Sequence, residues 1–244
     1  MEDILRTGSV ELGAPLNGGQ IRQLRAYAEL LKEWNEKINL TAITEDAEIA
    51  TKHFLDSMTA LCTGRVKGRV IDVGTGAGFP GLVLKIADPT IQLTLLDSLQ
   101  KRICFLEAAA EELDIPDVKF VHARAEDGAR RLRAQFDTVV SRAVANMTVL
   151  SELCIPFLKI GGYFLALKGP LADEELLAAK RTISILGGKV ESVYKADIPG
   201  TDLAHKIIIV KKVRQTPQQY PRKAGVPAKI PLEQCYNLKK SAKS

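Results

Sequence analysis

The stretch Val70-Ile71-Asp72-Val73-Gly74-Thr75-Gly76-Ala77-Gly78-Phe79-Pro80-Gly81 decides the fold of this 244-residue chain. Branched apolar residues around an acid predict a buried strand of a parallel sheet. Three alternating glycines then predict a turn with almost no side chains, in which backbone N–H groups are free for a ligand. Phe79-Pro80 is expected to open a helix, because proline fits the first helical turn. The stretch therefore predicts a strand, a ligand-binding turn and a helix.

Asp72 distinguishes between the ligands that such a turn can hold. The run from Gly76 to Gly81 also fits the glycine fingerprint of dinucleotide-binding proteins, which alone is a weak signal. A carboxylate just before the first glycine would repel a pyrophosphate, but it would attract the ammonium and sulfonium groups of S-adenosylmethionine (SAM). We therefore expect SAM to bind at Asp72, Gly74, Gly76 and Gly78. A nicotinamide or flavin cofactor and a purely structural turn are the alternatives.

Strand and helix patterns alternate along the chain after the glycine turn. Further strands are expected at 91–96, 118–122, 136–141 and 163–167, and helices at 81–87, 100–113, 146–158 and 172–186. The last two strands, at 189–194 and 205–212, have no helix between them and are expected to form an antiparallel hairpin at the sheet edge. This order predicts an α/β, doubly wound and mostly parallel seven-stranded sheet, and it resembles the class I methyltransferase fold.

The chain is expected to form one compact domain with three segments. Residues 1–62 form an N-terminal helical appendage with helices at 21–38 and 47–61, the second capped by Thr41 or Thr44. Residues 63–213 form the SAM-binding core. Residues 214–244 form an extended basic tail, in which four prolines (217, 221, 227 and 231) exclude regular structure.

Positive charge is concentrated towards the C-terminal end of the chain. From Lys206 onward there are ten Lys and Arg residues and a single acid, Glu233, although the net charge of the whole chain is only +5. The rest of the chain is slightly acidic. This asymmetry indicates a polyanionic partner that is addressed by one end of the protein.

Other features of the sequence argue against a signal peptide, a membrane-spanning segment and a metal site. The first six residues carry acids and no apolar run, and no apolar stretch approaches the ~20 residues that span a bilayer. The four cysteines are scattered, which is typical of reduced thiols in a cytoplasmic protein. Three dispersed histidines are too few for a metal site. We expect His122 and His205 to be structural, and His53 to be a core histidine or to face the pocket mouth with Asp56.

Side chains at the carboxyl ends of the strands should surround the ligand, because open α/β sheets bind ligands there. Asp97 ends the second strand, where its carboxylate can accept both ribose hydroxyls. After the third strand, Ala125 and Glu126 can flank the adenine, although acids are also ordinary residues at a helix N-terminus. Arg142 ends the fourth strand and can face the cofactor or the target base. A structural salt bridge is the alternative for Arg142.

The sequence offers no obvious general base or nucleophile. The Asn/Asp-Pro-Pro-aromatic motif that holds an exocyclic amine is absent after the fourth strand, where Ser141-Arg142-Ala143 stands instead. Cys154 lies within a predicted helix, in no context that favours covalent catalysis. A target atom with its own free lone pair, such as N7 of guanine, would need neither group.

Together these segments resemble the bacterial small-subunit ribosomal RNA guanine-N7 methyltransferases known as the RsmG or GidB family, over nearly the whole chain. The resemblance rests on Asn39-Leu40-Thr41, His53-Phe54-Leu55-Asp56-Ser57, the glycine turn, Leu96-Asp97-Ser98-Leu99-Gln100-Lys101-Arg102, Ser141-Arg142-Ala143 and Tyr220-Pro221-Arg222-Lys223-Ala224-Gly225. It implies methylation of one guanine in the decoding-region loop of 16S rRNA, with the small ribosomal subunit as partner.

The resemblance also implies roles for individual residues. The family's cofactor contacts fall on Gly74, Phe79, Ala125, Glu126 and Arg142, with Asp97, Ser98 and Leu99 at the ribose. Arg142 is expected to act in catalysis. We expect Arg222, Lys223 and Lys229 of the tail to contact RNA, and the protein to be a monomer. A small-molecule methyltransferase and a SAM-binding ribosome-assembly factor without catalysis are the alternative functions.

Overall fold

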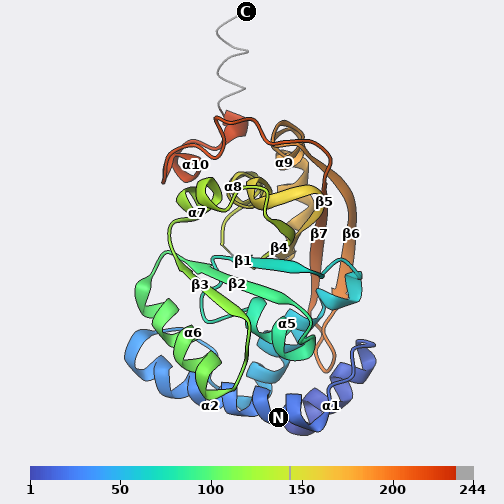
Figure 1. The fold of residues 1–244 in the computed structure, drawn as a ribbon. Coiled ribbons are helices and arrows are strands. Elements are labelled where there is room, and N and C mark those ends of the chain that lie inside the picture. Colours follow the sequence, from blue (N-terminus) through green and yellow to red (C-terminus); the bar gives the residue numbers. More distant parts are fainter. Residues whose placement is uncertain (143, 235–244) are drawn as a thin grey trace, which may run out of the picture.

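The computed structural model describes residues 1–142 and 144–234, and it shows a twisted sheet with helices on both faces (Figure 1). The order of its seven strands is β3-β2-β1-β4-β5-β7-β6. They are β1 (Arg69–Val73), β2 (Gln92–Asp97), β3 (Val118–His122), β4 (Phe136–Arg142), β5 (Leu158–Lys168), β6 (Gly188–Asp197) and β7 (Ala204–Lys212). The strands β1 to β5 pair in parallel, and β7 pairs antiparallel with both β5 and β6. The expected fold and its terminal hairpin are thus confirmed.

The order of the strands reverses at β1, which lies between β2 and β4. In a doubly wound sheet this reversal places the ligand site outside the carboxyl ends of the neighbouring strands. Residues near the end of β1 pair with the ends of both neighbours, since Asp72 is in register with Leu95 of β2 and with Val140 of β4. The glycine turn therefore emerges at this point of the sheet.

Two apolar layers hold the helices on the sheet. One face packs on α5 (Gly81–Ala87) and α6 (Gln100–Glu112), which α2 (Gly18–Ile38) covers in turn, and the other on α7 (Ala125–Arg131), α8 (Met147–Cys154) and α9 (Ala172–Ile185). Successive residues of β1 alternate between these layers, as Val70 belongs to the first and Ile71 to the second. Burial on both faces explains why the strands are apolar without alternation.

The N-terminal segment is a third layer on the first set of helices, at the bottom of Figure 1. The side-chain amide of Gln20 in α2 donates to the carbonyls of Ile86 and Ala87 at the end of α5, and Gln23 donates to Leu113 after α6. Helix α2 therefore caps the C-termini of α5 and α6. Residues of α1 (Glu2–Glu11) and α2 belong to the same apolar cluster as the sheet, so this segment shares the core of the protein.

Two expectations for the N-terminal segment are wrong, and α1 was not expected. The helix expected at 47–61 is divided into α3 (Asp46–Glu48), the π-helix η1 (Ile49–Leu55), α4 (Asp56–Met58) and the 3-10 turn η2 (Leu61–Thr63). Neither Thr41 nor Thr44 caps it, because α3 follows Glu45 and has no side-chain cap.

The C-terminal segment packs on the second helical layer, at the top of Figure 1. It contains α10 (Val226–Lys229), with Pro227 in its first turn, so the expectation that prolines exclude regular structure was wrong there. Leu232 and Tyr220 of this segment join the apolar cluster of α8 and α9. Ala143 and residues 235–244, including Cys235, lie outside the described residues. No helix in the described ranges is long and apolar enough to cross a membrane.

Candidate active site

The carboxyl ends of β1 to β4 surround a cavity of about 420 Å³, here named the cofactor cavity. Its volume falls within the range of roughly 300–1,000 Å³ that is typical of small-molecule sites. Six of the residues expected to bind the cofactor line it: Gly74, Asp97, Ser98, Ala125, Glu126 and Arg142. Gly74 has a positive φ of 73°, and a Cβ atom there would lie 2.6 Å from Cγ2 of Val144, which also lines the cavity. Glycine therefore keeps this wall of the cavity closely packed.

Asp97 organises the loops at the end of β2. Its Oδ1 accepts from the backbone N–H of Leu99 at 2.9 Å, and its Oδ2 accepts from the backbone N–H of Gly76 at 3.0 Å. The guanidinium of Arg102 pairs with Oδ2 at 3.3 Å. The Asp97 side chain is only 3% exposed. The carboxylate thus links the glycine turn to α6, and it lines the cavity where a ribose is expected.

Asp72 lies on the opposite side of β1 from the cofactor cavity, which was not expected. Its Oδ2 accepts from the N–H of Gly81 at 2.8 Å and from the hydroxyl of Thr75 at 2.7 Å. It therefore caps α5, which has the expected bounds and follows directly after Pro80; the peptide bond between Phe79 and Pro80 is cis. Burial raises the pKa of Asp72 to about 6, against the two hydrogen bonds.

The other Asp72 oxygen, Oδ1, is buried and accepts no hydrogen bond within the described residues. A buried polar atom without a partner is costly. The carboxylates of Asp97 and Glu126 at the cavity wall fit a cationic, hydroxyl-bearing ligand such as SAM.

Besides Asp72, four of the predicted cofactor residues do not line the cavity. Gly76 and Leu99 donate their backbone N–H groups to Asp97, and 42% of Leu99 is exposed. A Cβ atom at Gly78 would collide with the hydroxyl of Tyr27, so this glycine packs against α2. Phe79 lies in the core, with its ring stacked on His53 at 4.5 Å between centroids. These residues therefore support the glycine turn without lining the cavity. Their direct contact with the cofactor stays a prediction.

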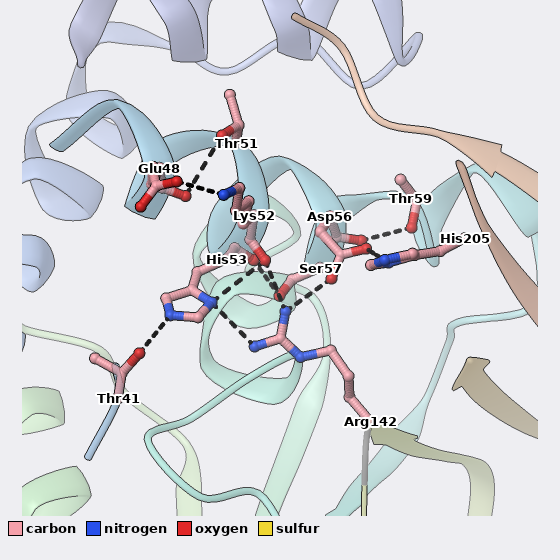
Figure 2. A network of polar contacts seen from close by, with 10 residues as sticks. All are labelled: Thr41, Glu48, Thr51, Lys52, His53, Asp56, Ser57, Thr59, Arg142 and His205. Atoms are coloured by element: carbon pink, nitrogen blue, oxygen red, sulfur yellow. Dashed lines mark hydrogen bonds and ion pairs between the residues drawn. The ribbon is translucent and has the colours of Figure 1, made fainter. Parts of the chain in front are cut away.

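Arg142 lies at the centre of a polar network that joins the N-terminal segment to the sheet (Figure 2). Its Nη1 donates to Asp56 Oδ2 at 2.8 Å and to the carbonyl of Lys52 at 3.1 Å. Its Cζ lies 5.1 Å from the centroid of the Phe79 ring, and its side chain is 16% exposed. The guanidinium is thus held in one orientation at the end of β4.

The contacts of this network shift the pKa values of Asp56, His53 and His205. The second oxygen of Asp56 pairs with His205 Nδ1 at 2.8 Å. Burial alone would raise the pKa of Asp56, but the His205 hydrogen bond and the Arg142 charge lower it below its usual value. The same hydrogen bond raises the pKa of His205, while burial and Arg142 lower the pKa of His53 to about 4. His205 therefore holds the Asp56 carboxylate, a contact in keeping with the structural role expected for it.

The C-terminal segment completes the cofactor cavity, which the sequence did not predict. Gly225 and Ala228 line the cavity, and the N–H of Gly225 donates to Glu126 Oε1 at 2.7 Å. Arg222 anchors the segment, since its Nε and Nη2 donate to the two oxygens of Glu152 at 2.9 and 2.7 Å. Glu152 belongs to α8 and its side chain is only 1% exposed. The guanidinium of Arg222 is thus used for anchoring, whereas Lys223 and Lys229 are exposed.

Fold and site together define the class of the protein. A seven-stranded sheet of this order, with a glycine turn after β1 and a carboxylate at the end of β2, is that of the class I SAM-dependent methyltransferases. The chain belongs to the family described as GidB, rRNA small subunit methyltransferase G, which matches residues 20–203. It is a methyltransferase, its cofactor is SAM, and its substrate is ribosomal RNA.

Members of this family from other bacteria are similar to the chain over nearly their whole length. The chain is 50% identical to the ribosomal RNA small subunit methyltransferase G of Alkaliphilus oremlandii, covering 96% of this chain and 99% of that one. It is 51% identical to the protein of the same name from Clostridium perfringens, with coverage of 95% and 98%.

Solved structures support the fold alone, because their sequence identity is low. TrmN from Thermus thermophilus is 18% identical and superimposes with a TM-score of 0.51, covering 67% of this chain and 53% of that one. A precorrin-6y C5,15-methyltransferase from Geobacter metallireducens is 17% identical with a TM-score of 0.51, covering 72% and 92%.

Proposed function

We propose that this protein transfers the methyl group of SAM to N7 of a guanine in the 16S rRNA of the small ribosomal subunit. The observation that carries the proposal is the position of Arg142. This residue lines both the cofactor cavity and a second cavity of about 660 Å³, so that it stands between a cofactor and an acceptor. Val144 and Ala145 are shared by the two cavities in the same way.

The groups around Arg142 are better suited to positioning than to proton abstraction. A guanidinium group is a hydrogen-bond donor without an acceptor atom, and Asp56 has both oxygens engaged by Arg142 and His205. Burial raises the pKa of the Cys154 thiol, which disfavours the thiolate that a covalent mechanism requires. N7 of guanine carries a free lone pair and needs no base. SAM supplies the activated methyl group, and holding N7 in line with it contributes up to ~7–11 kcal/mol through proximity and orientation.

Individual residues receive the following roles in this proposal. The cofactor is bound by Gly74, Phe79, Asp97, Ser98, Leu99, Ala125, Glu126 and Arg142, with Asp72, Gly76 and Gly78 forming the turn. Arg142 also orients the acceptor. Lys223 and Lys229 contact RNA phosphates, while Arg222 holds the segment that carries them. An enzyme with this substrate works as a cytoplasmic monomer on the small subunit.

Labelled SAM tests the proposal directly. The protein is incubated with labelled SAM and with small ribosomal subunits from a strain that lacks it. We expect label in the rRNA. Label only in small metabolites would indicate a small-molecule methyltransferase, and SAM binding without any transfer would indicate an assembly factor.

A further inference from the structure

The second cavity, here named the acceptor pocket, is lined by residues that lie far apart in the sequence, from Ile43 to His205. Ile43, Leu167 and Leu203 give it apolar walls, and Arg142 stands at its border with the cofactor cavity. Two carboxylates also line it, those of Asp56 and Glu175. Apolar walls suit the faces of a purine, and a carboxylate accepts hydrogen bonds from its edge.

We propose that the acceptor pocket binds the target guanine and that Glu175 reads its Watson–Crick edge. The Glu175 carboxylate accepts hydrogen bonds from N1–H and from the N2 amino group. This inference rests on the proposed function, because it concerns the base that receives the methyl group. It makes Glu175 a specificity-determining residue of the acceptor pocket.

Only one of the two carboxylates has an oxygen to offer to a base. Asp56 uses one oxygen for Arg142 and the other for His205. Glu175 uses Oε2 alone, which accepts from the N–H of Met147 at 2.8 Å and pairs with Lys168 Nζ at 2.7 Å. Among the described residues, no hydrogen bond reaches its Oε1. The Glu175 side chain is 26% exposed, so a base can reach it.

The contacts of Glu175 fix it relative to the wall between the two cavities. Met147 lies two residues after Ala145, a residue shared by both cavities, and Lys168 also donates to the carbonyl of Ala145. N7 lies on the side of the purine opposite N1 and N2. A guanine held by Glu175 through N1 and N2 turns its N7 edge away from α9, and in this proposal that edge lies at Arg142, which lines both cavities.

The chemistry of the carboxylate selects guanine among the four bases. Guanine alone presents two adjacent donors, N1–H and the N2 amino group, to one acceptor. Adenine and cytosine present a ring nitrogen acceptor beside their amino group, which would face the Glu175 oxygen unfavourably. A site that hydrogen-bonds a particular donor discriminates strongly against an analogue that lacks it, because the buried acceptor is then left unpaired.

The test compares guanosine with inosine, which lacks the N2 amino group, at the methylated position. The position is first mapped with small subunits from a strain that lacks the enzyme. Ligated rRNA that carries guanosine or inosine there is then reconstituted into subunits. The wild-type protein should transfer methyl to guanosine with a kcat/KM about 10–100-fold higher than to inosine. In Glu175→Gln this ratio should fall to near one.

The ratio separates recognition from a structural role of Glu175. Met147 and Lys168 both donate at Oε2, so the glutamine oxygen takes that place and its NH2 group faces the base. A structural defect would slow both substrates equally and leave the ratio unchanged. Glu174→Gln, an exposed acid of the same helical turn, is the matched control and should keep the wild-type ratio.

The outcomes distinguish this inference from the proposed function. A wild-type ratio near one, or an unchanged ratio in Glu175→Gln, would overturn the inference while methylation of guanosine N7 persists. Failure of the wild-type protein to methylate guanosine at N7 would overturn the proposed function itself.

Discussion

Removing the guanidinium of Arg222 should release the C-terminal segment from the cofactor cavity. In the structure this group donates to both oxygens of Glu152, and its Nη1 donates to the carbonyl of Ile230 at 2.8 Å. Gly225 and Ala228, which line the cavity, lie between these contacts in the chain. We therefore expect Arg222→Ala to weaken SAM binding although Arg222 does not line the cavity.

The magnitude follows from the burial of Glu152, whose side chain is 1% exposed, whereas that of Arg222 is 18% exposed. Breaking a buried ion pair by removing one partner typically costs about 3–5 kcal/mol. The backbone N–H of residue 222 still donates to Glu152 at 2.8 Å, which favours the lower end of this range. A loss of about 3 kcal/mol corresponds to a decrease in Tm of about 6–12 °C for a chain of this size.

Thermal unfolding and calorimetric titration with SAM measure the two effects. Lys223→Ala, the exposed neighbour, is the control and should leave Tm and SAM affinity unchanged. Replacing both partners, by Arg222→Met with Glu152→Leu, should recover most of the stability because no buried charge is left unpaired. A Tm within 2 °C of wild type together with unchanged SAM affinity in Arg222→Ala would refute the anchoring role.

Three further predictions concern the turn, the exposed lysines and the buried acid. Gly76 has a φ of 60°, which β-branched residues rarely adopt. The Gly76→Val variant should therefore bind SAM more weakly while its circular dichroism spectrum stays native. An unchanged Kd for SAM would count against the turn as a cofactor site. The double variant Lys223→Glu with Lys229→Glu should bind small subunits more weakly, while its Tm stays that of the wild type. The slope of log affinity against log salt concentration should become shallower by about 0.7 for each phosphate contact that is lost. An unchanged slope would place the RNA contacts elsewhere. The pKa of Asp72 is about 6 in the folded protein and 3.8 in the unfolded chain, so the folded state binds the proton more tightly. The free energy of unfolding of the SAM-free protein should therefore fall by about 3 kcal/mol as the pH rises from about 4 to 7. Asp72→Asn should flatten this profile, and a profile equal to wild type would show that another group titrates.

The sequence predicted those parts of the site that follow from local pattern. The strand at 118–122 has the expected bounds, and the acid that ends β2 lines the cavity as predicted, because a strand end next to a glycine turn is a local feature. Asp72 shows where this reasoning fails. Its position in the chain suggested a ligand contact, but side chains alternate along a strand, and Asp72 faces α5 while Val73 lines the cavity.

The remaining parts depend on contacts between distant residues. Gly225 meets Glu126 and Arg222 meets Glu152 across 99 and 70 positions of the chain, and no local pattern predicts such a pairing. Local pattern alone predicts an RNA contact for Arg222, a basic residue among prolines, whereas its pairing with Glu152 depends on the fold. Contact of Arg222 with RNA stays a prediction. The π-helix at 49–55 was also out of reach, because the spacing of His53 and Asp56 fits an ordinary helix equally well.

Chemical mapping of the methylated atom tests the central claim most directly. A guanine methylated at N7 carries a positive charge on its ring, which makes the base sensitive to borohydride reduction and lets aniline cleave the chain there. Small subunits from a strain that lacks the enzyme are incubated with the protein and SAM, and their 16S rRNA is then treated in this way. The account predicts one new cleavage, at a guanine, which is absent when SAM is omitted. Methyl transfer to the rRNA without any such cleavage would contradict it.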